Sequence, residues 1–334
     1  MRNYFSEKTT FLVLSFISGL LEIGCVIWAI SLKFSIPAVL GVGLAYQLGN
    51  FVPNPFSIGK KGTLAALVFS VLISFLSFFV LQYIMTFMSV LLFSASLQSL
   101  RSSSKSNLPE FTKRVWRVAG FVFSPLLLLP YSMFFLFLAV TLFSMFIYDL
   151  KIMPQAFSKA KIGKIGVVMI FHQIHYFSYV YFIPVIFYTC YKTSFYFLGL
   201  FVAAGWVVYI TVPKIAKGNS YFYYAVTGHL FLTILFPLMA FEMSNTVLFI
   251  LLWILSGLGG GTVFCIKKIN EQKENISSNA MNVAENLGHI GGTVIGLVGF
   301  LLTESFMVPF LAASFFAFLT AVSLILYKIK NGVN

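Results

Sequence analysis

Charge is scarce in this chain. Asp, Glu, Lys and Arg together make up 9% of its 334 residues, whereas a soluble domain carries about a quarter. Stretches without any charged residue run over 62–100, 118–148, 193–213, 218–241, 243–266 and 305–327. A membrane-spanning helix needs about 20 apolar residues. The scarcity of charge therefore excludes an ordinary soluble domain and predicts an integral membrane protein.

Cysteine is scarce as well, and several motifs are missing. The three cysteines, Cys25, Cys190 and Cys265, are scattered in apolar segments, which excludes a disulfide framework or a zinc-finger spacing. No segment has the polar–apolar alternation of a membrane β-strand, so the spans are expected to be helices. No metalloprotease motif or phosphate-binding loop is present. We therefore expect neither an enzyme nor a cofactor.

Apolar segments are abundant, and they divide the chain into twelve predicted spans. These lie near 9–31, 36–54, 63–81, 83–100, 115–130, 131–149, 165–189, 194–213, 220–241, 245–266, 279–302 and 306–327. On this map all but Lys33 and Lys192 of the 22 Lys and Arg residues fall on one side of the membrane. The positive-inside rule makes that side cytoplasmic, with both termini there. The net charge of +13 thus reflects loops at a cell (inner or plasma) membrane and not a nucleic-acid partner.

The two exceptional lysines indicate a repeat. Lys33 follows the first span and Lys192 follows the seventh, which is the same place in two successive sets of six. A parallel repeat of six plus six helices gives this pattern. The predicted domains are a six-helix bundle over 1–149, a cytoplasmic linker over 150–164 and a second six-helix bundle over 165–334.

A carboxylate stands near the middle of the first predicted span. Glu22 belongs to a stripe of small and polar residues that includes Ser18, Gly19 and Cys25 at helical spacing. Ionisable residues inside a membrane are costly and usually functional. We therefore predict that Glu22 carries a coupling proton. The alternative is a carboxyl that only hydrogen-bonds a neighbouring helix.

Further polar residues share faces of two other spans. Glu285 and His289 are four residues apart in the eleventh span, so they lie on one face and are expected to pair. One side of the seventh span carries His172, His175, Tyr176 and Tyr179. Lone histidines in membranes are often structural donors.

Two local patterns resemble a known family. "IGKKG" at 58–62 stands between the second and third spans, and "NVAENLGHIGGTVIGLVG" occupies 282–299. In the latter, Gly288, Gly292 and Gly296 recur every four residues, which predicts close approach of another helix. With twelve spans, internal termini and a basic central loop, the chain resembles the major facilitator superfamily (MFS). The implied fold class is an all-α integral membrane protein with twelve transmembrane helices as two six-helix bundles.

The resemblance implies a secondary active transporter that moves a small solute by alternating access. In that family, helices one, four, seven and ten line a central cavity, with two, five, eight and eleven beside them. The resemblance makes the ninth helix peripheral, so His229 is interpreted as structural. Carried over to this chain, the proton-coupling residues are Glu22 and Glu285. The expected solute contacts are Gln47, Asn50, His172, His175, Tyr176, Tyr179 and His289. The expected partners are a small molecule or ion, protons and the lipid bilayer, with the protein as a monomer.

Two alternatives stay open. Ferroportin-like members of the superfamily place acid, cysteine and histidine ligands on helices one, seven and eleven. A transition-metal or metal-chelate transporter of that kind would use Glu22, Cys25, His172, His175 and His289. The other alternative is a non-transporting membrane assembly or receptor protein on the same fold.

Overall fold

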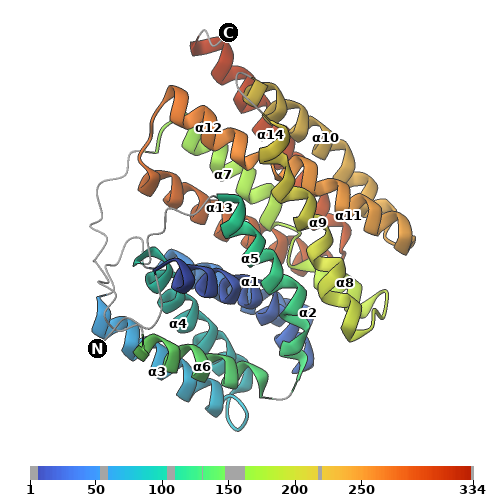
Figure 1. Ribbon diagram of the computed structural model, residues 1–334. Helices are drawn as coiled ribbons and strands as arrows, with labels where there is room; N and C mark the ends of the chain where they lie inside the picture. The colour runs from blue at the N-terminus through green and yellow to red at the C-terminus, as the bar shows by residue number, and fades with distance from the viewer. Residues whose placement is uncertain are drawn as a thin grey trace. The chain divides into compact units, whose positions relative to one another are not determined.

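The computed structural model describes residues 7–52, 59–103, 110–129, 131–146, 162–216 and 220–331. Every regular element in these ranges is a helix (Figure 1). Within them, seven helices have both the length and the apolar composition needed to cross a membrane. The predicted all-α integral membrane class is therefore confirmed. The count of twelve spans in two six-helix bundles stays a prediction.

Helices coincide with each of the first six predicted spans. They are α1 (Glu7–Ser31), α2 (Ile36–Phe51), α3 (Lys60–Leu76), α4 (Gln82–Ser103), α5 (Glu110–Phe123) with the 3₁₀ turn η1 (Ser124–Leu128), and α6 (Ser132–Phe146). The predicted division between the fifth and sixth spans falls between η1 and α6. Proline lacks an N–H donor and disfavours helix at the residue before it, so Pro130 accounts for this break.

The later helices are α7 (Lys164–Phe177), α8 (Phe182–Thr189), α9 (Phe195–Ile215), α10 (Tyr221–Phe241), α11 (Thr246–Gly260), α12 (Val263–Lys273), α13 (Ser278–Thr303) and α14 (Met307–Asn331). Two segments that the sequence predicts as single spans are interrupted. The segment 165–189 breaks before Pro184 into α7 and α8, because proline cannot donate to a preceding turn. The segment 245–266 breaks after Gly260 into α11 and α12, where consecutive glycines lower the helix propensity.

The chain forms two compact units. The first comprises Met1–Ser158 with Pro184–Leu200, and the second comprises Lys159–Ile183 with Phe201–Asn334. In the first, α1 packs against α5, η1 and α2, and α4 packs against α2 and α3. In the second, α7 packs against α13 and α14, and α10 packs against α14 and α11. The predicted bundle boundaries stay a prediction, and residues 150–161 of the predicted linker lie outside the described residues.

Two glycines let α1 and α5 touch backbone to backbone. Gly19 of α1 lies against the carbonyl oxygen of Arg117, and Gly120 of α5 lies against the carbonyl oxygen of Phe16. A side chain at either glycine would collide with backbone. The contact places the turn of α1 that follows Gly19 and carries Glu22 beside the turn of α5 that precedes Gly120 and carries Arg117.

Three glycines do the same between α13 and α7. Gly288, Gly292 and Gly296 lie against the carbonyl oxygens of Ile170, Ile174 and Ser178, respectively. The helix approach predicted from their four-residue spacing is confirmed. Figure 1 shows α13 running beside α7. With this side of α7 covered by α13, His172 and His175 lie on the side toward α10.

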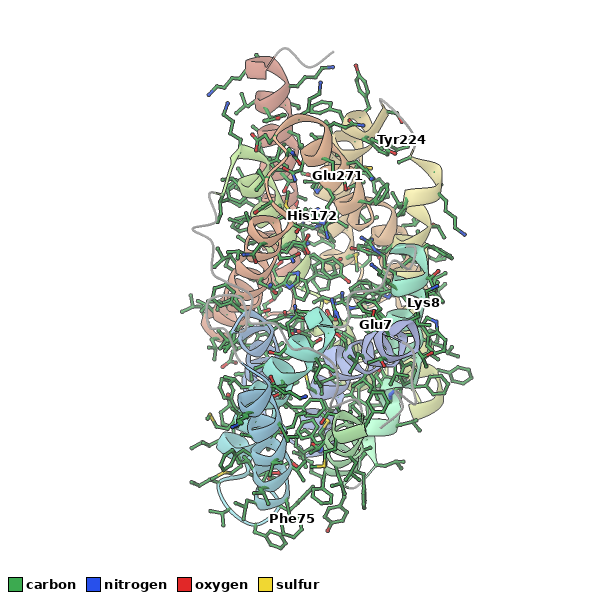
Figure 2. The ribbon with its side chains drawn as sticks, turned by 60° about the vertical axis from the view of Figure 1, so that its left-hand side comes forward. Glu7, Lys8, Phe75, His172, Tyr224 and Glu271 are labelled. Carbon is green, nitrogen blue, oxygen red and sulfur yellow. The ribbon has the colours of Figure 1, made fainter. Side chains whose placement is uncertain are left out.

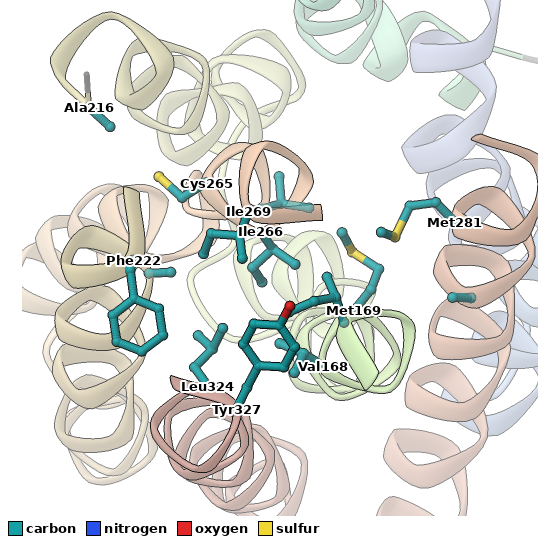
Figure 3. Packing of buried hydrophobic residues seen from close by; sticks show 14 residues of the cluster. Val168, Met169, Ala216, Phe222, Cys265, Ile266, Ile269, Met281, Leu324 and Tyr327 are labelled. Carbon is teal, nitrogen blue, oxygen red and sulfur yellow. The ribbon is translucent and has the colours of Figure 1, made fainter. Parts of the chain in front are cut away.

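The second unit has an apolar core at one end of its helices. Val168 and Met169 of α7 meet Phe222 of α10 and Leu324 and Tyr327 of α14 (Figure 3). Cys265 of α12 is buried in the same cluster. Like Cys25 and Cys190, it forms no disulfide, as the scattered cysteine spacing predicts. Lipid is as apolar as these side chains, so the hydrophobic effect does not drive helices together in a membrane. Close van der Waals packing of this kind holds them together instead.

Candidate functional site

Glu22 forms an ion pair in the first unit. Its side chain is 1% exposed, and its Oε2 atom accepts hydrogen bonds from Nε of Arg117 at 2.9 Å and from Nη2 at 2.5 Å. Arg117 is 30% exposed, so the pair joins a buried carboxylate to a partly exposed guanidinium. The charge distribution of the sequence predicts that Arg117 lies toward the cytoplasmic side of the membrane. It lies within α5 and balances the charge of Glu22.

A hydrogen-bonded chain adjoins this ion pair. Nη1 of Arg101 in α4 donates to the Ser18 hydroxyl at 2.9 Å. The Tyr46 hydroxyl of α2 donates to the Ser18 carbonyl oxygen and also lies 3.2 Å from the Ser18 hydroxyl. Four helices of the first unit thus contribute to one polar group, because Glu22 and Ser18 lie on α1 and Arg117 lies on α5.

The other predicted residues of the first unit surround this group. Asn50 hydrogen-bonds Tyr46 through its side chain, and Gln47 on the same helix is 1% exposed. The Cys25 thiol donates to the Glu22 carbonyl oxygen at 3.6 Å. Gln47, Asn50 and Cys25 thus lie near Glu22, as their predicted roles require, and those roles stay predictions.

Three histidines meet in the second unit. Nδ1 of His172 lies 2.8 Å from Nε2 of His229, and Nδ1 of His229 donates to the Ala225 carbonyl oxygen at 2.6 Å. One ring nitrogen from each of His172, His175 and His229 lies within 4.8 Å of the other two. All three rings are buried, with exposures of 2%, 0% and 0%. Figure 2 shows His172 between the helices, whereas Tyr224 and Glu271 lie at the surface.

The hydrogen bonds define where the protons lie in neutral rings. The carbonyl oxygen of Ala225 can only accept, so Nδ1 of His229 carries the proton. Nε2 of His229 then accepts from Nδ1–H of His172. His175 differs, because both of its ring nitrogens are buried without a hydrogen-bond partner among the described residues. An unpaired buried polar group costs about 1–3 kcal/mol.

The predicted tyrosines lie in an aromatic cluster. Tyr179 is 1% exposed and packs against Phe236 and Phe310, with ring centroids 4.7 and 5.3 Å away. Tyr176 packs against Trp206 at 5.2 Å. These contacts are those of a packed interior, and the proposed solute contacts of both tyrosines stay predictions.

Glu285 has a partner that the helical spacing does not reveal. Its Oε1 atom lies 2.6 Å from Nζ of Lys267 in α12, with side-chain exposures of 18% and 34%. His289, expected to pair with Glu285, packs its ring against Phe177 with centroids 4.0 Å apart. Glu285 thus contacts α12 and His289 contacts α7.

Sequence reasoning missed Arg117, Lys267 and His229 as site residues. The signal available for Arg117 was its place two residues inside the predicted fifth span, where a charge needs a partner. His229 was the remaining membrane histidine, and its contact with His172 joins residues 57 positions apart. Such contacts depend on which helices pack together, which single-helix spacing does not report.

No family model and no curated protein matches the sequence. The structure is similar to that of a bacterial homologue of the iron transporter ferroportin in an outward-facing state, at 14% identity and a TM-score of 0.62, covering 97% of this chain and 100% of that chain. It is also similar to the nucleoside transporter NupG, at 15% identity, a TM-score of 0.67 and coverage of 96% and 99%. The human organic anion transporter MFSD10 is similar at 14% identity and a TM-score of 0.61, covering 95% of this chain and 99% of that chain.

At these identities the similarity is one of fold. Each of the three solved structures is a transporter of the MFS fold, and each is matched over nearly its whole length. The described chain therefore has an MFS-like fold, and the resemblance inferred from its sequence is confirmed at that level.

Proposed function

We propose that this protein is a secondary active transporter that moves a small solute across the membrane by alternating access, driven by protons. The fold carries the proposal, because the structures it matches over 95–97% of its length are membrane transporters. The ferroportin homologue is known in outward-facing and inward-facing states. Alternating access is the exchange between two such states around one solute site. Among the alternatives, this similarity favours a transporter over an enzyme.

The solute class does not follow from the fold. The matched transporters are described as acting on nucleosides, organic anions, iron or metals. In this chain we assign solute contacts to buried or partly buried polar residues of both units. They are Gln47, Asn50, His172, His175, Tyr176, Tyr179 and His289.

Proton coupling is assigned to Glu22 and Glu285, each of which holds an ion pair to another helix. Glu22 binds Arg117 and joins α1 to α5, and Glu285 binds Lys267 and joins α13 to α12. A protonated carboxyl loses most of its electrostatic attraction to a neighbouring cation. Uptake of a proton by Glu22 would therefore loosen α1 from α5, which gives the proton a direct effect on helix packing.

The proposed setting is a cell membrane, with a monomer of two bundles over 1–149 and 165–334 joined by the linker 150–164. Both termini face the cytoplasm. Topology is tested with single cysteines and a membrane-impermeant thiol reagent applied to cells. The exposed Cys190 is first replaced by serine because it lies two residues from Lys192, while Cys25 and Cys265 are buried and stay.

Cysteines at Lys33 and Lys192 are expected to react from outside, and cysteines at Lys61 and Lys214 only after permeabilisation. Reaction of the Lys61 or Lys214 site in intact cells would contradict the orientation. Failure of Lys192 to react while Lys33 reacts would contradict the six-plus-six arrangement and leave the first half intact.

The transport proposal is tested in two steps. A thermal-shift screen of purified protein against nucleosides, organic anions, organic cations and transition metals identifies a ligand, because binding to the folded state raises stability. Uptake of that ligand is then measured in proteoliposomes with and without a proton gradient. Wild type is expected to accumulate it only with the gradient.

Glu22→Gln separates coupling from folding in the same assay. The variant is expected to lose gradient-driven accumulation and to retain exchange of labelled for unlabelled solute, which requires a folded transporter. Gradient-driven accumulation at the wild-type level in Glu22→Gln would contradict the role of Glu22. Glu285→Gln is the matched variant at the more exposed ion pair. Comparing the loss of gradient-driven accumulation in the two variants shows how much each carboxylate contributes to proton coupling.

A transition-metal ion is the second candidate solute, favoured by the meeting of His172, His175 and His229. Two matched structures are described as a homologue of an iron transporter and a metal transporter. The other metal donors expected from sequence are Glu22, Cys25 and His289. Of these, Glu22 is engaged by Arg117 and the Cys25 thiol by a carbonyl oxygen. Stabilisation by metals alone in the screen would promote this candidate, and no stabilisation by any ligand would favour a non-transporting protein.

A further inference from the structure

We propose that His172, His175 and His229 form a binding site for one first-row transition-metal ion, with Zn²⁺ as the reference ion. All three residues belong to the second unit, and the site requires no statement about the solute. It adds His229, from α10, to the two histidines of α7. The inference deepens the metal-ion candidate of the proposed function, which rests on the same three histidines, and its test measures binding separately from uptake.

The donor atoms are of one chemical kind. Three imidazoles suit Zn²⁺, Cu²⁺, Ni²⁺ and Fe²⁺, whereas Ca²⁺ and Mg²⁺ take oxygen ligands. One nitrogen from each ring lies within 4.8 Å of the others, and one pair is already at 2.8 Å. Zn–N bonds of about 2.0–2.1 Å place tetrahedral ligand nitrogens about 3.4 Å apart. Small rotations of the side chains, on the order of 1 Å at the ring nitrogens, therefore bring the rings to ligand geometry.

His229 has the outer support that a metal-bound histidine usually has. Its Nδ1–H is held by the Ala225 carbonyl oxygen at 2.6 Å. Such a bond fixes the tautomer and directs the other nitrogen, here Nε2, toward the ion. Nε2 of His229 already points at His172.

His175 is the observation that packing alone does not explain. Its ring is fully buried, and neither ring nitrogen has a hydrogen-bond partner among the described residues. Its ring neighbours are His172, His229, Phe236 and Tyr176. Apolar side chains would pack equally well beside Phe236 without leaving two polar atoms unpaired. A metal ion between the three rings gives one ring nitrogen of His175 a partner.

Coordination needs only a shift of tautomer at His172. If Nδ1 of His172 is the ligand atom, its proton moves to Nε2 and the ring stays neutral. Three neutral rings then hold the ion, and a tetrahedral ion has a fourth position for water or another ligand. The ion would tie α7 to α10, because the rings come from both helices.

The test uses the full chain without a histidine tag, purified in detergent and stripped of metal with a chelator. Zn²⁺ binding is measured by calorimetry and by metal analysis after gel filtration, and Co²⁺ binding by its visible absorption. Wild type is expected to bind one ion. X-ray absorption of the Zn²⁺ complex is expected to give imidazole nitrogens at about 2.0–2.1 Å.

Variants then assign the ligands. His172→Gln, His175→Gln and His229→Gln are each expected to weaken binding by more than about 100-fold, which exceeds the loss caused by removing an outer-shell partner. Cys265→Ala is the matched control, because it removes a buried metal-ligating side chain of the second unit outside the cluster and is expected to bind as wild type does. Loss of binding in Cys265→Ala equal to that in His175→Gln would overturn the assignment.

Wild type alone also tests the metal site, so the test does not depend on whether the variants fold. Absence of Zn²⁺ and Co²⁺ binding by folded wild type, or a first shell of sulfur or of oxygen only, would overturn it. Solute uptake is a separate measurement. Solute uptake without metal binding would contradict the metal site and support the transporter. Metal binding without solute uptake would contradict the transporter and support the metal site.

Discussion

The two units place polar side chains in an apolar interior in different ways. In the first unit Glu22 carries charge, and Arg117 supplies the opposite charge at 2.5 Å. In the second unit one hydrogen bond of 2.8 Å joins two of the histidines to each other, and the ring nitrogens of His175 take no hydrogen bond among the described residues. The carboxylate of the first unit thus has its partner within the chain. The ring nitrogens of His175 do not have one among the described residues, and this is the basis of the proposed metal site.

This difference separates two kinds of function. A buried ion pair is stable while both charges are present and becomes unstable when one is removed. It therefore suits a switch driven by a proton. Neutral imidazoles around a common point suit the binding of a cation. The ion pair and the histidine cluster lie in different units, so each is expected to be open to mutation without a change in the other.

The largest expected effect comes from breaking the pair between Glu22 and Arg117. Removal of one partner of a buried pair destabilises a protein by about 3–5 kcal/mol. We expect Arg117→Gln near the lower end, because Arg117 is 30% exposed. Thermal denaturation in detergent measures the loss. The double variant Glu22→Gln/Arg117→Gln is the control and is expected to be more stable than Arg117→Gln, since no unpaired charge remains. Additive losses in the double variant would mean that the two residues act independently.

The next effect concerns the glycines that position α7. Gly292→Ala puts a methyl group against the Ile174 carbonyl oxygen, whereas the adjacent Gly291→Ala meets only the Ile174 side chain at 3.4 and 3.5 Å. Overpacking costs about 1–3 kcal/mol. Alanine in place of glycine in an open helical position stabilises by up to about 1 kcal/mol. Denaturation temperatures are therefore expected to fall for Gly292→Ala and to hold or rise for Gly291→Ala. Equal responses would contradict the contact between α13 and α7.

A smaller effect is expected at the histidines without metal. His229→Leu removes the acceptor for His172 and the donor to Ala225. The buried Nδ1–H of His172 is then unpaired, which costs about 1–3 kcal/mol, and the apolar leucine offsets part of this. A modest fall in denaturation temperature is therefore expected in the presence of chelator. His289→Leu, outside the cluster, is the comparison. A variant as stable as wild type would show that the bond between His172 and His229 contributes nothing measurable.

The smallest effect is expected at Lys267 and Glu285. Both side chains are partly exposed, at 34% and 18%, and such pairs contribute about 0–1 kcal/mol. Lys267→Gln is expected to lower stability slightly, and high salt should narrow the difference from wild type because exposed charges are screened. The corresponding difference for Arg117→Gln should depend less on salt. A salt-independent loss of several kcal/mol at Lys267 would place that pair in the same class as Glu22 and Arg117.

Much of the fold follows from local sequence. A long apolar segment in lipid must satisfy its backbone hydrogen bonds within itself, so apolar length predicts a helix. Pro130 and the glycines Gly257–Gly261 fall at or next to observed breaks, because proline and glycine act on the backbone of their own turn. Neither the break before Pro184 nor the break after Gly260 was predicted, since the apolar run continues across each of them.

The sequence also determined which residues require an explanation. Glu22, His172 and His175 stand out because ionisable groups in apolar segments need partners. Only the tertiary structure decided what those partners are. Arg117 is 95 positions from Glu22, and His229 is 57 positions from His172. Helical periodicity reports which residues share a face, whereas the partner depends on which helix packs against that face, and glycine contacts such as that of Gly19 with Arg117 determine this packing in the folded chain.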